Sequence, residues 1–406
     1  MKKVFIISLF VSLASLGVAQ ELMSYNTPIK KSYYSNSLGD SIHFEIILPK
    51  NLGQQLNVEY PVFYLLDKQL EINYKYNLHT IDYLSTLQKI PKTVLIGISF
   101  SNKNRSSWTT PNKSGGKADD LIRFICNNLH KEIKKEYPIS NFNLLIGHSR
   151  TAILSSYALS KRPDFFNGTI ASSSSNFDFG DKFQFNQFES FLNDIDSSSH
   201  KYFYYFSVGD STHGDLHESA TDAMNSYLST TTLPTNLDWM YLKHKAAHDV
   251  SPGLTVAKSL NEIFSEYGKR FNRCLKITRD SNGIVPWKEF NKLYDSISTN
   301  LGMKVQFSEL FYNSMASEYY NDYEGLYGEN NLHFSIEILK DAIKSYPNDY
   351  EYFIWIGEMY ITLKEFDKGK SYLKTAEELL NSTSKISSDD KESGMMEIKN
   401  LKALIK

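Results

Sequence analysis

One serine stands where a predicted strand gives way to a predicted helix, in residues 144–152, which read LLIGHSRTA. This strand–turn–helix context is typical of a nucleophile elbow, in which a strained turn lifts the serine above the sheet. The helix that follows points its N-terminus at the developing negative charge. The pattern predicts Ser149 as a nucleophile and the backbone N–H of Arg150 as an oxyanion donor. Thr151 replaces the usual second glycine, and its larger side chain requires a wider strand–helix separation.

A serine nucleophile needs a base, and in this chain order the base follows a late strand. His244 and His248 both follow the predicted strand at 239–242. His244 sits too close to that strand, whereas His248 lies in a loop that leads into a helix from about Gly253. We therefore expect His248 to take the proton of Ser149 and later to donate it to the leaving alcohol.

The acid that orients this histidine is expected in the loop after the predicted strand at 202–208. Asp210 comes directly off the strand, and Asp215 lies further along the loop. The sequence favours Asp210 as the acid and leaves Asp215 as the alternative. Either residue could instead cap the helix that starts near His217.

Two histidine pairs give the sequence an alternative, a metal site. His213 and His217 are four positions apart, as are His244 and His248, and on a helix this spacing places two imidazoles on one face. No glutamate follows the first histidine of either pair, so the zinc-protease motif is absent. Both pairs also fall in predicted loops. We expect neither a metal site nor a cofactor.

Further segments resemble, in the same order, the blocks of the Putative esterase family, which includes esterase D-like, feruloyl and enterochelin esterases. The resemblance covers about residues 35–267, and its segments are YPVFYLLD at 60–67, IGIS at 96–99, NR at 104–105, TP at 110–111, GGKAD at 115–119, RPDFF at 162–166 and ASSS at 171–174. It implies an α/β-hydrolase fold, a doubly wound and mostly parallel sheet with its active site at the carboxyl ends of the strands. It also implies a catalytic histidine just before a Ser/Val/Pro turn, where His248 stands.

The same resemblance implies a second oxyanion donor, a backbone N–H just after Asp67. The family typically has a glycine there, whereas this chain has Lys68 and Gln69, and the choice between these two stays open. Trp108 and Arg105 are expected to contact the substrate.

The elements that must position these residues alternate between about residues 41 and 272. Short apolar runs predict strands at 42–48, 62–66, 94–98, 144–146, 169–171, 202–208 and 239–242. Amphipathic periodicity predicts helices between several of them, for instance at 119–133, 152–159 and 254–267. This alternation favours a largely parallel sheet covered on both faces. The strand at 42–48 is expected at an antiparallel edge.

Beyond about residue 272, helical periodicity dominates. Ala342 and Ala376 are 34 positions apart, as are Leu339 and Leu373, and this is the period of tetratricopeptide repeats. We expect a helical-repeat region that either caps the esterase domain or binds a protein partner. The predicted divisions are a signal peptide (1–19), an esterase domain (20–272), linker helices (273–310) and a tetratricopeptide-like domain (311–406).

Charge and the N-terminal segment indicate the setting. A net charge of -2 over 406 residues argues against a nucleic-acid partner. Residues 1–19 combine a basic start, an apolar run and small residues near Ala19, the pattern of a secretory signal. The run is shorter than the roughly 20 residues that span a bilayer. We expect a periplasmic or secreted protein without a transmembrane anchor.

Together these features predict an exported serine carboxylic-ester hydrolase that works through an acyl-enzyme. Its expected substrate is a small-molecule or glycan-linked ester, such as a siderophore, feruloyl or acetyl ester. The alternative is a catalytically inactive hydrolase-fold protein whose helical repeats recruit a partner or substrate. Thr151 and the missing glycine after Asp67 are the two features that favour this alternative.

Overall fold

The computed structural model describes residues 22–50, 52–53, 56–174, 182–195, 200–281, 284–322, 325–382 and 386–405. An eight-stranded sheet lies at its centre, with the strand order β1-β2-β4-β3-β5-β6-β7-β8. The strands are β1 (Ile29–Ser35), β2 (Asp40–Ile47), β3 (Tyr60–Leu66), β4 (Val94–Ser99), β5 (Ile139–His148), β6 (Gly168–Ser172), β7 (Tyr202–Val208) and β8 (Leu237–Lys243). The strand β2 is antiparallel to both β1 and β4, and all other neighbours run parallel. The predicted mostly parallel sheet is confirmed.

The degree of burial explains why seven strands could be predicted from the sequence and one could not. Every residue of β3 and of β7 is buried, so these strands read as continuous apolar runs. All seven predicted strands occur, but β1 adds an eighth. Most of its residues are exposed. The strand predicted at the antiparallel edge, β2, therefore lies one position inside, because β1 pairs with it and forms the edge.

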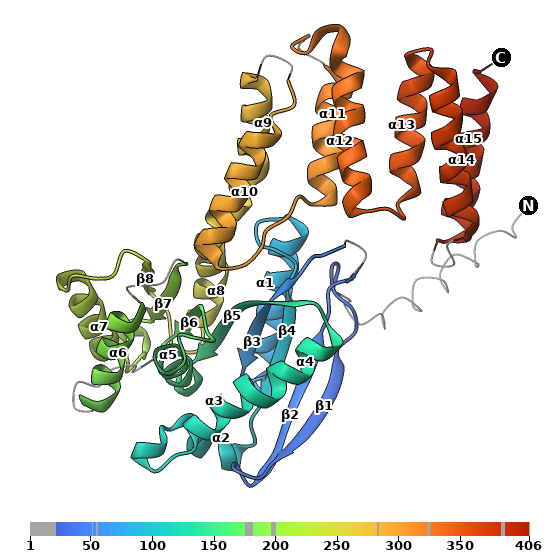
Figure 1. The fold of residues 1–406 in the computed structure, drawn as a ribbon. Helices are drawn as coiled ribbons and strands as arrows, with labels where there is room; N and C mark the ends of the chain where they lie inside the picture. The colour runs from blue at the N-terminus through green and yellow to red at the C-terminus, as the bar shows by residue number, and fades with distance from the viewer. Residues whose placement is uncertain are drawn as a thin grey trace, which may run out of the picture.

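Helices cover both faces of the sheet (Figure 1). They are α1 (Glu71–Thr86), α2 (Asn102–Thr109), α3 (Ala118–Phe124), a π-helical turn (Ile125–Leu129), α4 (His130–Glu136), α5 (Arg150–Lys161), α6 (Lys182–Ile195), α7 (Glu218–Thr230) and α8 (Ser251–Ile263). The helices α1 and α8 pack into one apolar core, and α3, α5 and α6 pack into a second. Cys126 is buried in the second core and Cys274 in the first, and both are free thiols.

The rest of the described chain is helical. Its α-helices are α9 (Ser265–Asp280), α10 (Trp287–Leu301), α11 (Glu309–Asn321), α12 (Asn331–Ser345), α13 (Tyr350–Thr362), α14 (Phe366–Ser382) and α15 (Ser388–Ala403). Figure 1 shows them leading away from the sheet, with the C-terminus at the far end of the stack. The helix α9 runs across residue 272, so the domain boundary predicted there falls inside a helix.

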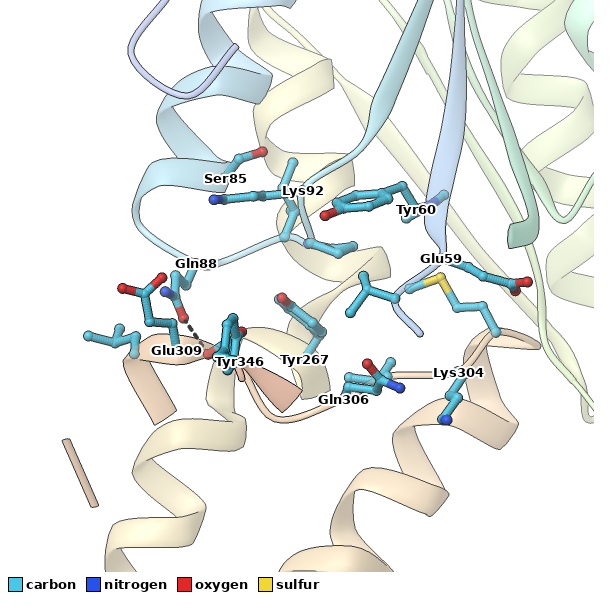
Figure 2. A pocket seen from close by; sticks show the side chains of 18 of the residues that line it. Glu59, Tyr60, Ser85, Gln88, Lys92, Tyr267, Lys304, Gln306, Glu309 and Tyr346 are labelled. Atoms are coloured by element: carbon cyan, nitrogen blue, oxygen red, sulfur yellow. Dashed lines mark hydrogen bonds between the residues drawn. The ribbon is translucent and has the colours of Figure 1, made fainter. Parts of the chain in front are cut away.

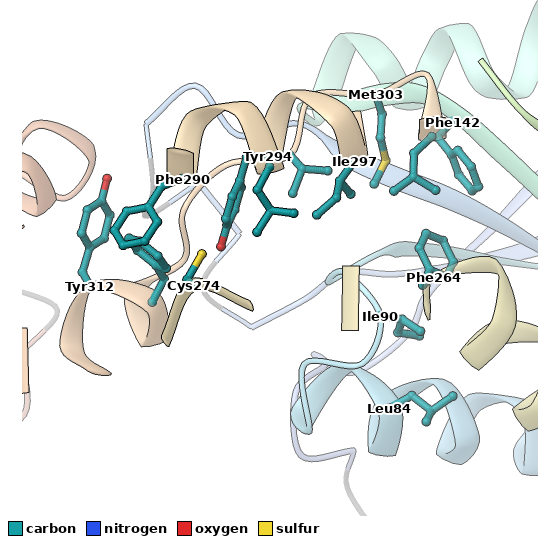
Figure 3. Packing of buried hydrophobic residues seen from close by; sticks show 14 of the residues in the cluster. Leu84, Ile90, Phe142, Phe264, Cys274, Phe290, Tyr294, Ile297, Met303 and Tyr312 are labelled. Atoms are coloured by element: carbon teal, nitrogen blue, oxygen red, sulfur yellow. The ribbon is translucent and has the colours of Figure 1, made fainter. Parts of the chain in front are cut away.

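The helical region and the sheet share one apolar core. Phe142 of β5 and Ile90 before β4 belong to the same buried cluster as Phe290 and Tyr294 of α10 and Tyr312 of α11 (Figure 3). Burial of apolar side chains from both parts stabilises their contact. The helices predicted as a linker at 273–310 therefore form part of this common core.

Small residues set the helix spacing further along the stack. A Cβ on Gly357 of α13 would lie 2.8 Å from the side chain of Leu373 in α14, and a Cβ on Gly369 would lie 2.8 Å from that of Ile361. Ala342 and Ala376, the pair at the predicted period, are both fully buried. The predicted all-helical region is confirmed, and its assignment to tetratricopeptide repeats stays a prediction.

In the part of the chain that the structure describes, no helix has the length and apolar character needed to cross a bilayer. The predicted signal peptide at 1–19 lies outside the described residues.

Candidate active site

Ser149 lies on a strained turn between β5 and α5. Its backbone has φ 57° and ψ -121°, a region that side-chain-bearing residues rarely adopt. Its N–H donates to the carbonyl oxygen of Ser172 at the end of β6, at 2.9 Å. The turn also requires Gly147, because a Cβ there would lie 2.4 Å from the backbone oxygen of Thr151. The predicted elbow geometry is present at Ser149.

Three neighbouring strands end in the same unusual way at this edge of the sheet. Asp67 after β3, Ser149 after β5 and Ser173 after β6 all have positive φ, at 63°, 57° and 49°. Such strain is stored at functional sites, where the surrounding structure over-determines it. These strands are parallel, so the three residues share their carboxyl edge.

Thr151, which stands in place of the second glycine, is fully buried and hydrogen-bonded. Its hydroxyl accepts from the N–H of His148 at 3.0 Å. It also lies 2.8 Å from Oδ2 of Asp67, to which it can donate its proton. The substitution is therefore accommodated by hydrogen bonds that a glycine could not make.

His248 lies in the loop between β8 and α8, about one-third exposed, with its Nδ1 3.2 Å from Oδ1 of Asp215. Since a carboxylate can only accept, Nδ1 carries the proton and Nε2 is left with a lone pair. Nδ1–H held on a carboxylate is the tautomer that a general base for a serine requires.

Asp215 is fully buried and its carboxylate accepts four hydrogen bonds. The donors are the hydroxyl of Ser173, the backbone N–H groups of Gly209 and His217, and Nδ1 of His248. Burial acts to raise the pKa of the Asp215 carboxyl, but the hydrogen bonds outweigh burial and hold the pKa below its ordinary value. Asp215 is therefore a charged, immobilised partner for His248.

The structure pairs His248 with Asp215 and not with Asp210, the acid that the sequence favours. The carboxylate of Asp210 caps a 3₁₀ turn (Ser211–His213) and accepts from the hydroxyl of Thr212 at 2.7 Å and from the ring of His213 at 2.5 Å. Hydrogen bonds from Thr212 and then His213 lower the pKa of Asp210. Asp210 thus caps the local turn, and the alternative residue, Asp215, lies beside His248.

His148 links the elbow to the loop of the base. Its Nε2 lies 2.9 Å from the carbonyl oxygen of His248 and donates to it, and the two ring centroids are 4.7 Å apart. Burial lowers the pKa of His148, which favours the neutral ring. This contact places the His248 loop against the residue next to Ser149. In the described part of the chain, no hydrogen bond joins the Ser149 hydroxyl to His248 itself.

The predicted oxyanion donors are backbone N–H groups, and they differ in whether they already make a hydrogen bond. The N–H of Lys68 already donates to the carbonyl oxygen of Ile98 at 2.9 Å, which removes one of the two predicted candidates. Within the described residues, the N–H groups of Gln69 and Arg150 make no hydrogen bond to another protein group. Gln69 is fixed by its own side chain, which donates to Asp67 at 2.6 Å and accepts from the N–H of Phe100 at 2.9 Å.

The two predicted substrate-binding residues lie in different surroundings. Trp108 is only 2% exposed and packs against Phe100 in the apolar core beneath α2, so its side chain does not face solvent. Arg105 makes a two-pronged ion pair with Asp67, at 2.7 and 2.6 Å. This pairing raises the pKa of Arg105. Arg105 supports the turn at Asp67, and about a quarter of its side chain stays exposed. Its role in substrate binding stays a prediction.

The histidine pairs considered for a metal do not form. His213 contacts Asp210, and Nε2 of His244 lies 3.0 Å from the hydroxyl of Thr255. His217 instead lies beside His248, with ring centroids 5.1 Å apart. This neighbour was not predicted, since only the folded loop brings residue 217 to residue 248.

A cavity of about 340 Å³ lies away from this site, between the sheet and the helical region (Figure 2). Tyr60, Lys92, Tyr267, Gln306 and Tyr346 are among its lining residues. It opens at the amino ends of β3 and β4. The seven residues of β3 span about 23 Å, so the cavity is remote from Ser149. None of the described residues that line it is a histidine, so it offers no Ser–His pair.

Comparison with known proteins identifies the class of this fold. Residues 35–227 match the family model described as "Putative esterase". No curated protein matches the chain by sequence. The resemblance predicted from the sequence motifs is thus confirmed over residues 35–227.

Three solved structures resemble the chain at low sequence identity. An IroE-like serine hydrolase from Shewanella oneidensis is 19% identical with a TM-score of 0.58, over 78% of this chain and 100% of that one. An uncharacterised protein from Capnocytophaga ochracea is 15% identical with a TM-score of 0.57, over 93% and 100%. The BES protein from Bacillus cereus is 17% identical with a TM-score of 0.51, over 60% and 97%. At these identities the likeness shows the fold, and the predicted α/β-hydrolase class is confirmed.

Proposed function

We propose that this serine esterase of the α/β-hydrolase type, whose residues 35–227 match the Putative esterase family, uses Ser149 as nucleophile, His248 as base and Asp215 as acid. The observation that carries the proposal is the hydrogen bond between His248 and a buried, four-fold bonded Asp215, next to a serine on a strained turn. In this class of hydrolase the triad has the chain order serine, acid, histidine, and Ser149, Asp215 and His248 follow that order.

In the proposed reaction, Nε2 of His248 takes the hydroxyl proton as Ser149 attacks the ester carbonyl carbon. The oxygen that becomes negatively charged is held by the N–H groups of Gln69 and Arg150. The imidazolium then donates its proton to the leaving alcohol, which leaves an acyl group on Ser149. Water, deprotonated by His248, releases the acid and restores the serine.

The surroundings of the site favour an ester with an aromatic, anionic acyl group. Leu70, Leu216 and Val250 are exposed large apolar side chains, and each lies one or two positions from a proposed catalytic group. The side chain of Arg150 is exposed beside the nucleophile and makes no ion pair with another described residue. A catecholate-siderophore ester combines both features, a feruloyl ester supplies the aromatic group, and an acetyl ester supplies neither. We propose this substrate class for a protein exported by the signal at residues 1–19.

Two assays test the reaction. The protein is expected to hydrolyse short p-nitrophenyl esters and to form a covalent adduct with a serine-directed phosphonate. Ser149→Ala is expected to lose the adduct and at least about 10³-fold in kcat. A folded wild-type protein that forms no adduct would support the inactive binding protein instead. Full activity in Ser149→Ala would exclude this serine as the nucleophile.

The substrate class has its own test. Among feruloyl, catecholate-siderophore and acetyl esters, kcat/KM is expected to be highest for the aromatic esters. Arg150→Ala is expected to lower kcat/KM for charged acyl groups and to leave neutral p-nitrophenyl esters nearly unchanged. An equal loss on both kinds of ester would remove the role proposed for this side chain.

A further inference from the structure

The catalytic loop contains a third side chain that the proposed reaction does not use. The imidazole of His217 is half-buried beside His248, and no hydrogen bond to another described residue engages its ring. Asp215, His217 and His248 each offer a ligand atom, and these three atoms lie within 4.8 Å of one another. Two imidazoles and a carboxylate form the kind of donor set that three-ligand zinc sites use.

From this arrangement we propose that Asp215, His217 and His248 form an inhibitory site for Zn²⁺ or a similar borderline transition metal. The inhibition, but not the binding, rests on the proposed function of His248. Tetrahedral zinc with bonds of about 2.0–2.1 Å places its ligand atoms roughly 3.4 Å apart, so the three groups must close by about an ångström. The ring of His217 can move to do so without breaking a hydrogen bond to a described residue.

The types of ligand determine which metals the site can bind. Mg²⁺ and Ca²⁺ prefer all-oxygen sites, and two imidazoles select against them.

Metal binding and catalysis are mutually exclusive, whichever ring nitrogen of His248 binds the metal. A metal on Nε2 takes the lone pair that would accept the serine proton. A metal on Nδ1 displaces the hydrogen bond to Asp215 and leaves the proton on Nε2, which then cannot act as the base. The bound metal thus removes the base without altering Ser149, and its removal by a chelator restores it.

The test compares hydrolysis with and without Zn²⁺ in wild type, His217→Ala and the matched control His213→Ala. His213 is exposed, lies four positions away and contacts Asp210 instead of the site. We expect Zn²⁺ to inhibit wild type and His213→Ala equally, with reversal by EDTA, and Mg²⁺ to have no effect. His217→Ala is expected to need about tenfold more Zn²⁺. Each protein is compared with its own metal-free rate, so an effect of the substitution on that rate does not change the measured degree of inhibition.

Calorimetry separates this proposal from the esterase proposal. Ser149→Ala is expected to bind one Zn²⁺ per chain, and the double variant Ser149→Ala/His217→Ala is expected to bind it about tenfold more weakly. This result needs no activity, so it would stand even if the chain were not an esterase. Equal zinc affinity with and without His217, or equal inhibition of wild type and His217→Ala, would overturn the site.

Discussion

Replacing Asp215 by asparagine tests the hydrogen bond between Asp215 and His248. The asparagine amide has nearly the same shape as the carboxylate, but an NH₂ donor replaces one of the two acceptor oxygens. Each carboxylate oxygen of Asp215 accepts two hydrogen bonds: Oδ2 from Ser173 and Gly209, and Oδ1 from His217 and His248. An asparagine must turn its NH₂ group toward one of these pairs.

Both orientations of the asparagine carry a cost. With NH₂ toward Ser173 and Gly209, the serine hydroxyl can turn to accept, but the N–H of Gly209 faces another donor. With NH₂ toward His217 and His248, the ring of His248 can accept only by moving its proton to Nε2, which removes the base. An opposed buried donor costs about 1–3 kcal/mol of folding free energy. The wrong tautomer, or a misplaced ring, lowers kcat by roughly 10²–10⁴-fold.

The measurement is kcat on a p-nitrophenyl ester, together with the free energy of unfolding in urea. Asp215→Asn is expected to lose at least about 10²-fold in kcat while remaining folded. Asp210→Asn is the matched control, since its carboxylate caps an exposed turn, and it is expected to change the free energy of unfolding little and to lower kcat no more than a few-fold. If Asp210→Asn lost as much kcat as Asp215→Asn, or if Asp215→Asn kept nearly full activity, the assignment of the acid would be refuted.

Three further substitutions and conditions test the elbow and the core. Gly147→Ala is expected to abolish activity and soluble expression, because its Cβ would lie 2.4 Å from a backbone oxygen, whereas Gly253→Ala meets nothing closer than 3.8 Å and should be tolerated. Thr151→Val removes a donor to Asp67 and the acceptor of a buried N–H, so urea unfolding should show a loss of about 2–4 kcal/mol that the serine variant largely avoids. Burial lowers the pKa of His130 from 6.5 to about 4, so the unfolded chain takes up a proton at a higher pH than the folded chain. Stability should therefore fall by up to about 3 kcal/mol between pH 6.5 and 4, and a flat profile in wild type, or an equal slope in His130→Phe, would contradict this.

The elements and the strained turn at Ser149 could be predicted because they depend on local pattern. Buried parallel strands such as β3 and β7 read as unbroken apolar runs, and the elbow combines a strand, a glycine and a helix start within nine residues. The missed strand, β1, lies at the edge, where one partner strand and solvent impose no apolar pattern on its side chains. Its pairing with β2 depends on the fold and not on its own composition.

The hydrogen-bond partner of His248 and the surroundings of Trp108 could not be predicted, because they depend on the paths of loops. Asp210 stands nearer to its strand in the sequence, but the chain turns at Ser211–His213 and brings Asp215 back under Gly209 and beside His248. Trp108 gives no sign in the sequence of whether it faces a pocket or the core. Its burial against Phe100 follows from how α2 sits on the sheet.

The two departures from the family pattern are connected through one carboxylate. Oδ1 of Asp67 accepts from the side chain of Gln69, and Oδ2 lies within hydrogen-bonding distance of the Thr151 hydroxyl, while Arg105 binds both oxygens. Gln69 and Arg150 carry the two proposed oxyanion N–H groups, so Asp67 fixes the position of one donor relative to the other.

Oxyanion donors stabilise a transition state only if they are already in place when charge develops. A glycine at 151 would bring the strand and helix closer but would offer no hydroxyl to Asp67. Thr151 instead connects helix and turn by a hydrogen bond to Asp67. Gln69, where the family has a glycine, holds the turn by side-chain hydrogen bonds to Asp67 and to the N–H of Phe100. The two departures from the family pattern are therefore joined through Asp67, and the hydrogen bonds they make would hold the two proposed oxyanion donors in place.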